Sequence, residues 1–362
     1  MFDDKSLKLM KEMMEAFGPS GFEREINTLL KRWMEPYTDE VVTDKLGSIA
    51  FISKGTSEKP RILLAGHTDE VGFIISGVTK EGYLTFNPLG SWWDQVLLGQ
   101  RVVIRGDKGD VNGIIASKPP HILSDEEKRK LVEKKDMFID IGATDDDEVE
   151  EEGIKVGDPV VPWSPFSLIQ GGKVAMGKAF DDRIGAFIIV EAIRRIKEQR
   201  IPHDNFVYGA ATVQEEIGFR GAQTITHVVG PDVAIILEVD IAGDVPGIKP
   251  QDALTKMGKG PTLLTYDGSM IPNQPLKNYV IDVAKQAQIP LQLSQLRGGG
   301  TDGGRVHIGR AGCPTVVIGI PTRHIHSHVG LLSLKDVENA VRLVIELIKR
   351  LDADTVEEFT AF

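Results

Sequence analysis

The sequence predicts an α/β fold in which a mixed sheet carries helices on both faces, with a small β-barrel-like domain inserted into it. Outside residues 71–165, apolar strand-like runs alternate with amphipathic helical runs, which is typical of a sheet covered on both sides. Within 71–165 the helical periodicity disappears, and short apolar runs alternate with turn residues, as in a mostly antiparallel β-domain. We therefore expect residues 1–70 and 166–362 to form one domain and residues 71–165 to form the insert.

Two helices open the chain. Apolar side chains recur at helical spacing over residues 5–17, and Gly18-Pro19 ends that helix. Ser20 and Glu23 have the spacing of a capping box, which predicts the start of the second helix. Short apolar runs rich in β-branched residues then predict strands at 40–44, 48–53 and 61–67.

After the insert, helical and strand-like patterns alternate again. The segments expected to be helical are 184–199, 278–288 and 334–352, and those expected to be strands are 205–213, 233–240 and 314–321.

Composition and charge exclude several classes of protein. The net charge of -11 over 362 residues argues against a nucleic-acid-binding face, which needs clustered Lys and Arg. The single cysteine, Cys313, rules out an intrachain disulfide and a thiolate metal cluster. The N-terminus lacks the features of a signal peptide, and no apolar run approaches the ~20 residues that span a bilayer. We expect a cytoplasmic protein without a membrane partner.

Acidic and imidazole side chains gather where the predicted strands end. In open α/β sheets the carboxyl ends of the strands form the ligand-binding crevice, so these side chains are expected to converge. A cluster of His, Asp and Glu without Cys suits Zn, Co or Mn in a hydrolytic site. Its size exceeds the needs of one ion and suits a pair roughly 3.5–4 Å apart, bridged by a carboxylate and a water. The adjacent acids of "VQEEIGFRG", Glu215 and Glu216, would then divide the work as base and ligand.

Six ordered motifs identify a family. "GHTDEVGF", "KAFDDRIGA", "QEEIGFRGA", "EVDIA", "GGGTDGG" and "PTRHIHS" resemble those of the M42 family of dinuclear-metal aminopeptidases, which includes glutamyl, leucyl and tetrahedral aminopeptidases. The resemblance covers essentially the whole chain. It implies a metallo-exopeptidase that hydrolyses the N-terminal residue of peptides with two divalent ions, a bridging water and a glutamate base.

The resemblance also implies roles for individual residues. Glu215 would be the general base, and Asp69 would accept a hydrogen bond from the first metal-binding imidazole. The Asp181–Asp182 peptide tends to be cis in this clan, and Asp181 would bridge the two ions. The implied metal ligands are His67, Asp181, Glu216, Asp240 and His326.

Spacing alone leaves part of the site open. In "RHIHSH", His324, His326 and His328 alternate, and only the family pattern selects His326. Asp181 and Asp182 could instead cap the helix that follows. The "GGGTDGG" segment satisfies G-x-G-x-x-G, but no helix pattern and no suitably placed acid follow it, so we reject a nucleotide site.

Two other activities compete with the aminopeptidase interpretation. A metal-dependent deacylase of small N-acylated metabolites would use the same ions and favour blocked amines. An endoglucanase needs two carboxyls on opposite sides of one bond, which neighbouring Glu215 and Glu216 can hardly supply. For the aminopeptidase we expect neutral, aliphatic N-terminal residues, and the sequence does not choose among the metals.

The insert carries no recognisable chemistry. "GSWWDQVLLGQ" places Trp92 and Trp93 side by side, so on a barrel strand one would face the core and the other the outside, unless both are tucked into one core. An outward tryptophan suits a subunit contact. In the family that the chain resembles, the insert mediates dimers that build dodecamers, so we expect a homo-oligomer of twelve subunits.

Overall fold

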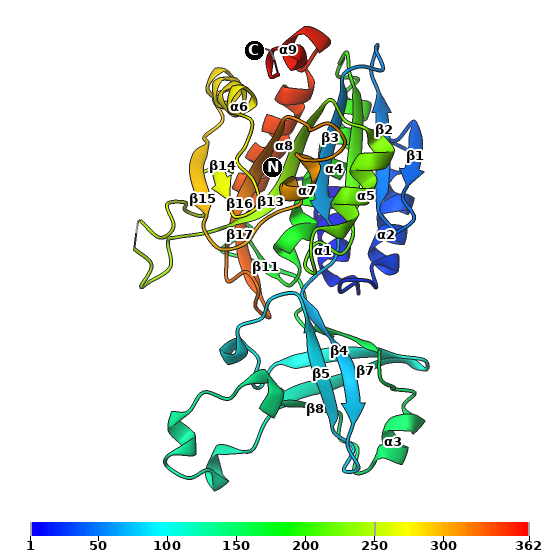
Figure 1. Cartoon of the computed structure of the whole chain (residues 1–362), viewed down its shortest axis with the longest axis vertical. Coiled ribbons are helices and arrows are strands. Elements are labelled where there is room, and N and C mark those ends of the chain that lie inside the picture. Colours follow the sequence, from blue (N-terminus) through cyan, green and yellow to red (C-terminus); the bar gives the residue numbers. More distant parts are fainter. Residues whose placement is uncertain (1, 250, 361–362) are drawn as a thin grey trace.

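The computed structural model describes residues 2–249 and 251–360 and shows an α/β domain joined to a smaller barrel (Figure 1). The barrel lies at one end of the long axis, and the chain passes twice between the barrel and the α/β domain. Within the described residues, no helix is both long and apolar enough to cross a membrane.

The large sheet has 11 strands and mixed direction, as the sequence predicted. Nine of them follow the order β1-β2-β12-β3-β13-β16-β17-β11-β10, and β14 and β15 are attached beside β16. The strands are β1 (Glu40–Thr43), β2 (Ile49–Lys54), β3 (Arg61–His67), β10 (Ser167–Ile169), β11 (Val174–Gly177), β12 (Phe206–Thr212), β13 (Val233–Ile241), β14 (Thr262–Asp267), β15 (Gln292–Leu296), β16 (Thr315–Arg323) and β17 (Gly330–Ser333).

Helices cover both faces of this sheet, because the apolar side chains of each central strand alternate between two cores. In β3, Ile62 and Leu64 pack on one side, and Leu63 and Ala65 pack on the other. The first core is shared with α1, α2, α4, α6, α8 and α9, and the second with α5 and α7. The helices are α1 (Asp4–Glu15), α2 (Arg24–Met34), α4 (Phe180–Glu198), α5 (Arg220–Val229), α6 (Gln274–Gln286), α7 (Gly303–Val306), α8 (Leu334–Ile348) and α9 (Ala353–Glu358).

The inserted segment forms a closed six-stranded barrel in the order β4-β5-β8-β7-β6-β9. Its strands run from Gly72 to Pro162, inside the expected range 71–165. Of the paired tryptophans, Trp92 is buried and stacks on Phe73, whereas Trp93 is 62% exposed. The strands are β4 (Gly72–Val78), β5 (Leu84–Leu89), β6 (Arg101–Gly106), β7 (Gly109–Ala116), β8 (Phe138–Asp140) and β9 (Pro159–Pro162), with helix α3 (Asp146–Glu151) and the single turns η1 (Asp94–Val96), η2 (Pro120–Ile122), η3 (Glu127–Arg129) and η4 (Lys134–Asp136).

Four neighbouring strands of the large sheet determine where a ligand can bind. Strands β12, β3, β13 and β16 are mutually parallel along their shared edges. Their carboxyl ends therefore open on the same side of the sheet, which is where ligands bind in open α/β folds.

One local prediction is wrong. Ser20 and Glu23 do not form a capping box: Glu23 itself occupies the N-cap position of α2, and its side chain makes no capping hydrogen bond to that helix. The Ser20 hydroxyl donates instead to Asp69, and the Glu23 carboxylate accepts from the backbone of Gln214.

Candidate metal centre and active site

The candidate site begins with a carboxylate that lies between two imidazoles. Asp181 Oδ1 is 3.2 Å from Nε2 of His67, and Asp181 Oδ2 is 3.1 Å from Nε2 of His326. His67 is the last residue of β3, and His326 follows β16, so the parallel strands bring residues far apart in the sequence together. The structure thus places these three residues of the predicted site in one group.

The start of α4 delivers Asp181 to this position. The Asp181–Asp182 peptide is cis, as the resemblance implied, and both residues have non-helical backbone angles. Asp182 accepts hydrogen bonds from the backbone N–H groups of His67 and Gly185, so it joins the helix to the strand end. A side chain on Gly185 would meet Asp182 and the carbonyl of Leu237 at 2.4–2.5 Å, so only glycine permits this close approach.

Each imidazole is oriented through its other nitrogen. His67 Nδ1 lies 3.1 Å from the carbonyl of Asp69 and 3.3 Å from its carboxylate. His326 Nδ1 lies 2.8 Å from the carbonyl of Ser91, which belongs to the barrel. An N–H on Nδ1 that donates to these acceptors leaves Nε2 with a free lone pair, the arrangement that metal-binding histidines adopt.

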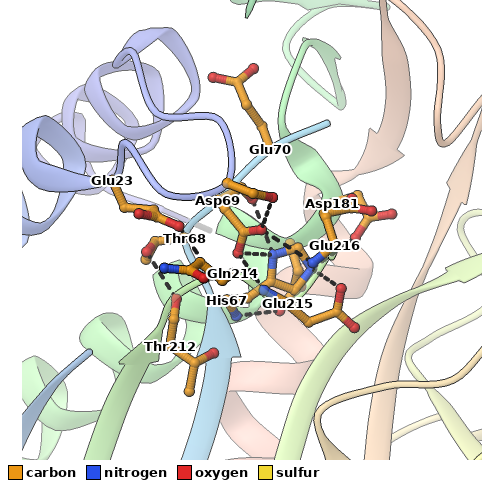
Figure 2. Close-up of polar contacts among 12 residues, drawn as sticks. Glu23, His67, Thr68, Asp69, Glu70, Asp181, Thr212, Gln214, Glu215 and Glu216 are labelled. Carbon is orange, nitrogen blue, oxygen red and sulfur yellow. Dashed lines mark hydrogen bonds and ion pairs between the residues drawn. The ribbon is translucent and has the colours of Figure 1, made fainter. Parts of the chain in front are cut away.

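The two adjacent glutamates follow β12 in a loop held by Asp69 (Figure 2). The backbone N–H of Glu215 donates to Asp69 Oδ1 over 3.0 Å, and that of Glu216 donates to Asp69 Oδ2 over 3.1 Å. The side chains then turn to different imidazoles: Glu215 Oε2 is 3.6 Å from His67 Nε2, and Glu216 Oε1 is 3.5 Å from His326 Nε2. Asp69 therefore contacts both the first imidazole and the loop that carries the glutamates.

Asp240, one of the predicted ligands, lines the same cavity but does not belong to the groups of potential ligand atoms around the two imidazoles. Its carboxylate faces Thr262 and Ser294, and one of its oxygens accepts a hydrogen bond from the backbone N–H of Ile241. Glu238 takes the expected place, with Oε1 3.9 Å from His67 Nε2.

Sheet register explains why Glu238, and not Asp240, lies near His67. Ile236 of β13 pairs with Ala65 of β3, so the same register carried two residues further puts Glu238 level with His67. Asp240 lies another two residues along the strand, about 7 Å beyond that level. Only the register of β13 against β3 distinguishes Glu238 from Asp240, and no local sequence pattern reveals that register.

The potential ligand atoms form three overlapping groups in which all atoms lie within 4.8 Å of one another. Asp181 is shared by two of them, one centred on each imidazole. The groups are His67, Asp181 and Glu238; Asp181, Glu216 and His326; and His67, Glu215 and Glu216.

Burial of so many acids shifts their protonation strongly. Burial raises the pKa of Glu216 to about 8, and it raises the pKa values of Glu215 and Glu238 well above the usual range. Burial alone would lower the pKa of His326, but the charges of Glu216 and Asp181 outweigh it and raise the pKa to about 10. The groups of potential ligands contain more carboxylates than imidazoles, and bound cations would neutralise the excess negative charge.

Comparison with known proteins gives the family. The model of the M42 glutamyl aminopeptidase family matches residues 47–343, well over half of the chain. The chain belongs to the M42 peptidase family. It is therefore a metal-dependent hydrolase of peptide bonds that acts as an exopeptidase, an aminopeptidase.

Three M42 relatives show how closely the whole chain follows the family. A TET aminopeptidase from the marine sediment archaeon Thaumarchaeota archaeon SCGC AB-539-E09 is 75% identical, covering 99% of this chain and all of its own, with a TM-score of 0.98. The lysyl aminopeptidase of Pyrococcus furiosus is 32% identical over 95% of this chain and 97% of its own length. The Pyrococcus horikoshii TET1 peptidase, described as assembling into a tetrahedron or a large octahedral shell, is 30% identical over 96% of this chain and all of its own, with a TM-score of 0.84.

The donor set of this M42 chain fits divalent metal ions. It consists of imidazole nitrogens and carboxylate oxygens, which suit Zn, Co and Mn. Glu216 Oε1 is buried and has no hydrogen-bond partner among the described residues, so it is free to bind a cation.

A cavity of about 340 Å³ opens onto the M42 site. Its wall combines the acids with Phe219, Ile241 and Leu296, and with the glycines of the "GGGTDGG" segment. None of the described residues that line it is a lysine or an arginine. Arg323, one of the basic residues near the site in sequence, is paired with Asp244 instead.

Proposed function

We propose that this aminopeptidase uses two divalent cations that share Asp181. The observation that carries the proposal is the position of Asp181, whose two oxygens face two different imidazoles at 3.2 and 3.1 Å. We assign His67 and Glu238 to one cation and His326 and Glu216 to the other. Each cation would then have three protein ligands and open positions for water and substrate, as catalytic metal sites do.

Glu215 is the proposed general base. When bound, the two cations would polarise the scissile carbonyl and lower the pKa of a shared water. Glu215 is not needed as a ligand, and its Oε2 lies 3.6 Å from His67 Nε2, so its carboxylate is placed to accept a proton from water and pass it to the leaving amine. Asp69 would position this base through the loop and orient His67.

We propose a neutral N-terminal residue as the preferred substrate. The cavity offers apolar wall residues and no basic side chain, so it could not neutralise an acidic one. The substrate's free α-amine, a cation at neutral pH, would be attracted by the acids of the site. Zn, Co and Mn all suit the proposed ligands.

We also propose that the barrel builds a homo-oligomer of twelve subunits, arranged as dimers in a tetrahedron. The tetrahedral or octahedral assembly described for the Pyrococcus horikoshii relative supports this, and so does the apolar surface of the barrel. Trp93 is 62% exposed, and Ile122 and Leu131 on the neighbouring loop are 65% and 69% exposed. Large exposed apolar side chains of this kind are typical of subunit contacts.

A comparison of two substrates tests the activity. Chelator-stripped protein, with Co or Zn added back, is given an unblocked leucyl peptide and its N-acetylated form. We expect metal to restore cleavage of the unblocked peptide alone. Cleavage of the acetylated form alone would make the protein a deacylase, and cleavage of neither would remove the proposed role of Glu215.

A further inference from the structure

The loop that carries the proposed base leaves its sheet and gives up its strand hydrogen bonds. Strand β12 ends at Thr212, and Gln214 adopts a positive φ of 56°, a conformation that costs a non-glycine residue free energy. The backbone N–H groups of Gln214, Glu215 and Glu216 follow one another in this turn. Something outside the loop must accept these hydrogen bonds and keep the turn in shape.

Two carboxylates accept all three (Figure 2). Asp69 takes the N–H groups of Glu215 and Glu216 over 3.0 and 3.1 Å. Glu23 takes the N–H of Gln214 over 3.0 Å through its Oε1, which also accepts from Gly21 over 2.7 Å. The loop is thus held at its first residue by a segment that lies 191 positions away in the chain.

The side chain of Glu23 does not cap helix α2, although its position in the sequence suggests that role. It sits at the start of α2 without capping that helix by a side-chain hydrogen bond. Its side chain is buried, with 6% of the residue exposed, near the fully buried Asp69. Burial first, and the charge of Asp69 next, raise the pKa of Glu23 to about 7. Placing two buried acids near each other destabilises the fold. Both carboxylates accept hydrogen bonds from the backbone N–H groups of the same loop, which gives them a shared role.

We propose that Glu23 is a positioning residue for catalysis, which holds the backbone at Gln214 and thereby fixes the carboxylate of Glu215. The inference rests on the proposed role of Glu215 as the base. Glu23 acts on the reaction only through the loop. A displacement of about 1 Å in a catalytic group can cost ~100-fold in rate, so loosening the first residue of the turn should be felt in kcat.

The acceptor, and not the charge, is what the geometry requires. Glu23→Gln keeps a carbonyl oxygen at the same distance along the side chain and can still accept from Gln214. Glu23→Asp keeps the charge but withdraws the oxygen by one methylene, and Glu23→Ala removes it. We expect Glu23→Asp and Glu23→Ala to lose about 10- to 100-fold in kcat, with KM within about 2-fold and metal content unchanged, and Glu23→Gln to stay within about 3-fold of the parent.

Hydrogen exchange gives a readout that does not depend on activity. The amides of residues 214–216 should exchange faster in Glu23→Asp and Glu23→Ala than in the parent or in Glu23→Gln. A matched control is Asp336→Ala, since Asp336 is also buried and also accepts from two backbone N–H groups, of Gly258 and Gly260. It should lower Tm without changing kcat or the exchange of 214–216.

The outcomes separate clearly. Equal kcat in the parent and in Glu23→Ala, or equal damage in Glu23→Gln and Glu23→Asp, overturns the proposal. If Glu23→Ala does not fold, the comparison of Glu23→Gln with Glu23→Asp decides alone. Failure of the proposed function shows elsewhere, as a parent without aminopeptidase activity or a fully active Glu215→Gln.

Discussion

Asp181 Oδ2 lies 3.1 Å from Nε2 of His326, while the other oxygen of the same carboxylate faces His67. Replacing Asp181 by Asn removes the charge that both cations would share and puts an amide NH₂ where one of them would bind. We expect metal content, measured by mass spectrometry after dialysis, to fall from two equivalents per chain to fewer than one. Asp244→Asn, outside the cluster, should keep both, and unchanged metal content in Asp181→Asn would contradict the shared site.

Measuring the metal content also distinguishes Glu238 from Asp240 as the ligand. Glu238→Ala should lose about one equivalent of metal, because Glu238 belongs to a group of potential ligands with His67 and Asp181. Asp240→Asn should retain both equivalents, because the Asp240 carboxylate faces Thr262 and Ser294. The reverse result would restore the ligand expected from the sequence.

Glu215→Gln keeps the volume and removes the proton acceptor. We expect kcat to fall at least about 100-fold, the lower range for a general base, with KM and metal content nearly unchanged. Steady-state rates on an unblocked leucyl peptide, with metal analysis of the same sample, check this. Near-normal activity would mean that another group takes the proton.

Lys178 gives a pH dependence of stability. Burial lowers its pKa to about 8, against 10.5 for an exposed lysine, although its Nζ is paired with Glu70. Between pH 8 and 10.5 the unfolded chain binds more protons at this position, so stability rises with pH through this group. The Tm of the parent minus that of Lys178→Met should therefore increase from pH 7.5 to 10. A constant or falling difference would show that Lys178 stays charged in the fold.

Trp93 tests the subunit contact. Trp93→Asp places a charge in the proposed interface, where burying it without a partner is costly. We expect light scattering to show dimers or monomers in place of the large assembly. Val228→Asp, an equally simple change at a residue that is 45% exposed on the α/β domain, should leave the assembly intact. Splitting by Val228→Asp alone would place the contact on the other domain.

Patterns along the chain predicted the fold and the gathering of acidic and imidazole side chains at strand ends, and the family resemblance supplied the individual site residues. Strand-like and helical periods predicted the mixed sheet, and the carboxyl ends of parallel strands explain why His67, Asp181 and His326 meet. The barrel was predicted from the loss of helical period, but the sequence did not determine which tryptophan is exposed, and Trp92 and Trp93 lie between β5 and η1 and not in a strand.

Pairing between distant segments could not be read from local patterns. Choosing Glu238 over Asp240 needs the register of β13 against β3, which no window of sequence contains. Ser20 and Glu23 matched a local capping motif, but their partners, Asp69 and Gln214, lie 49 and 191 residues away. Ser91 carries its part of the site in a backbone carbonyl, which leaves no trace in residue identity.

The backbone carbonyl of Ser91 links the barrel directly to an imidazole of the active site. His326 Nδ1 contacts the Ser91 carbonyl over 2.8 Å. Ser91 directly precedes Trp92 and Trp93 in the chain. A small rotation of the barrel relative to the sheet would therefore change the orientation of the His326 imidazole. If the barrel makes the proposed subunit contacts, a displacement of the barrel would reach His326 through this hydrogen bond.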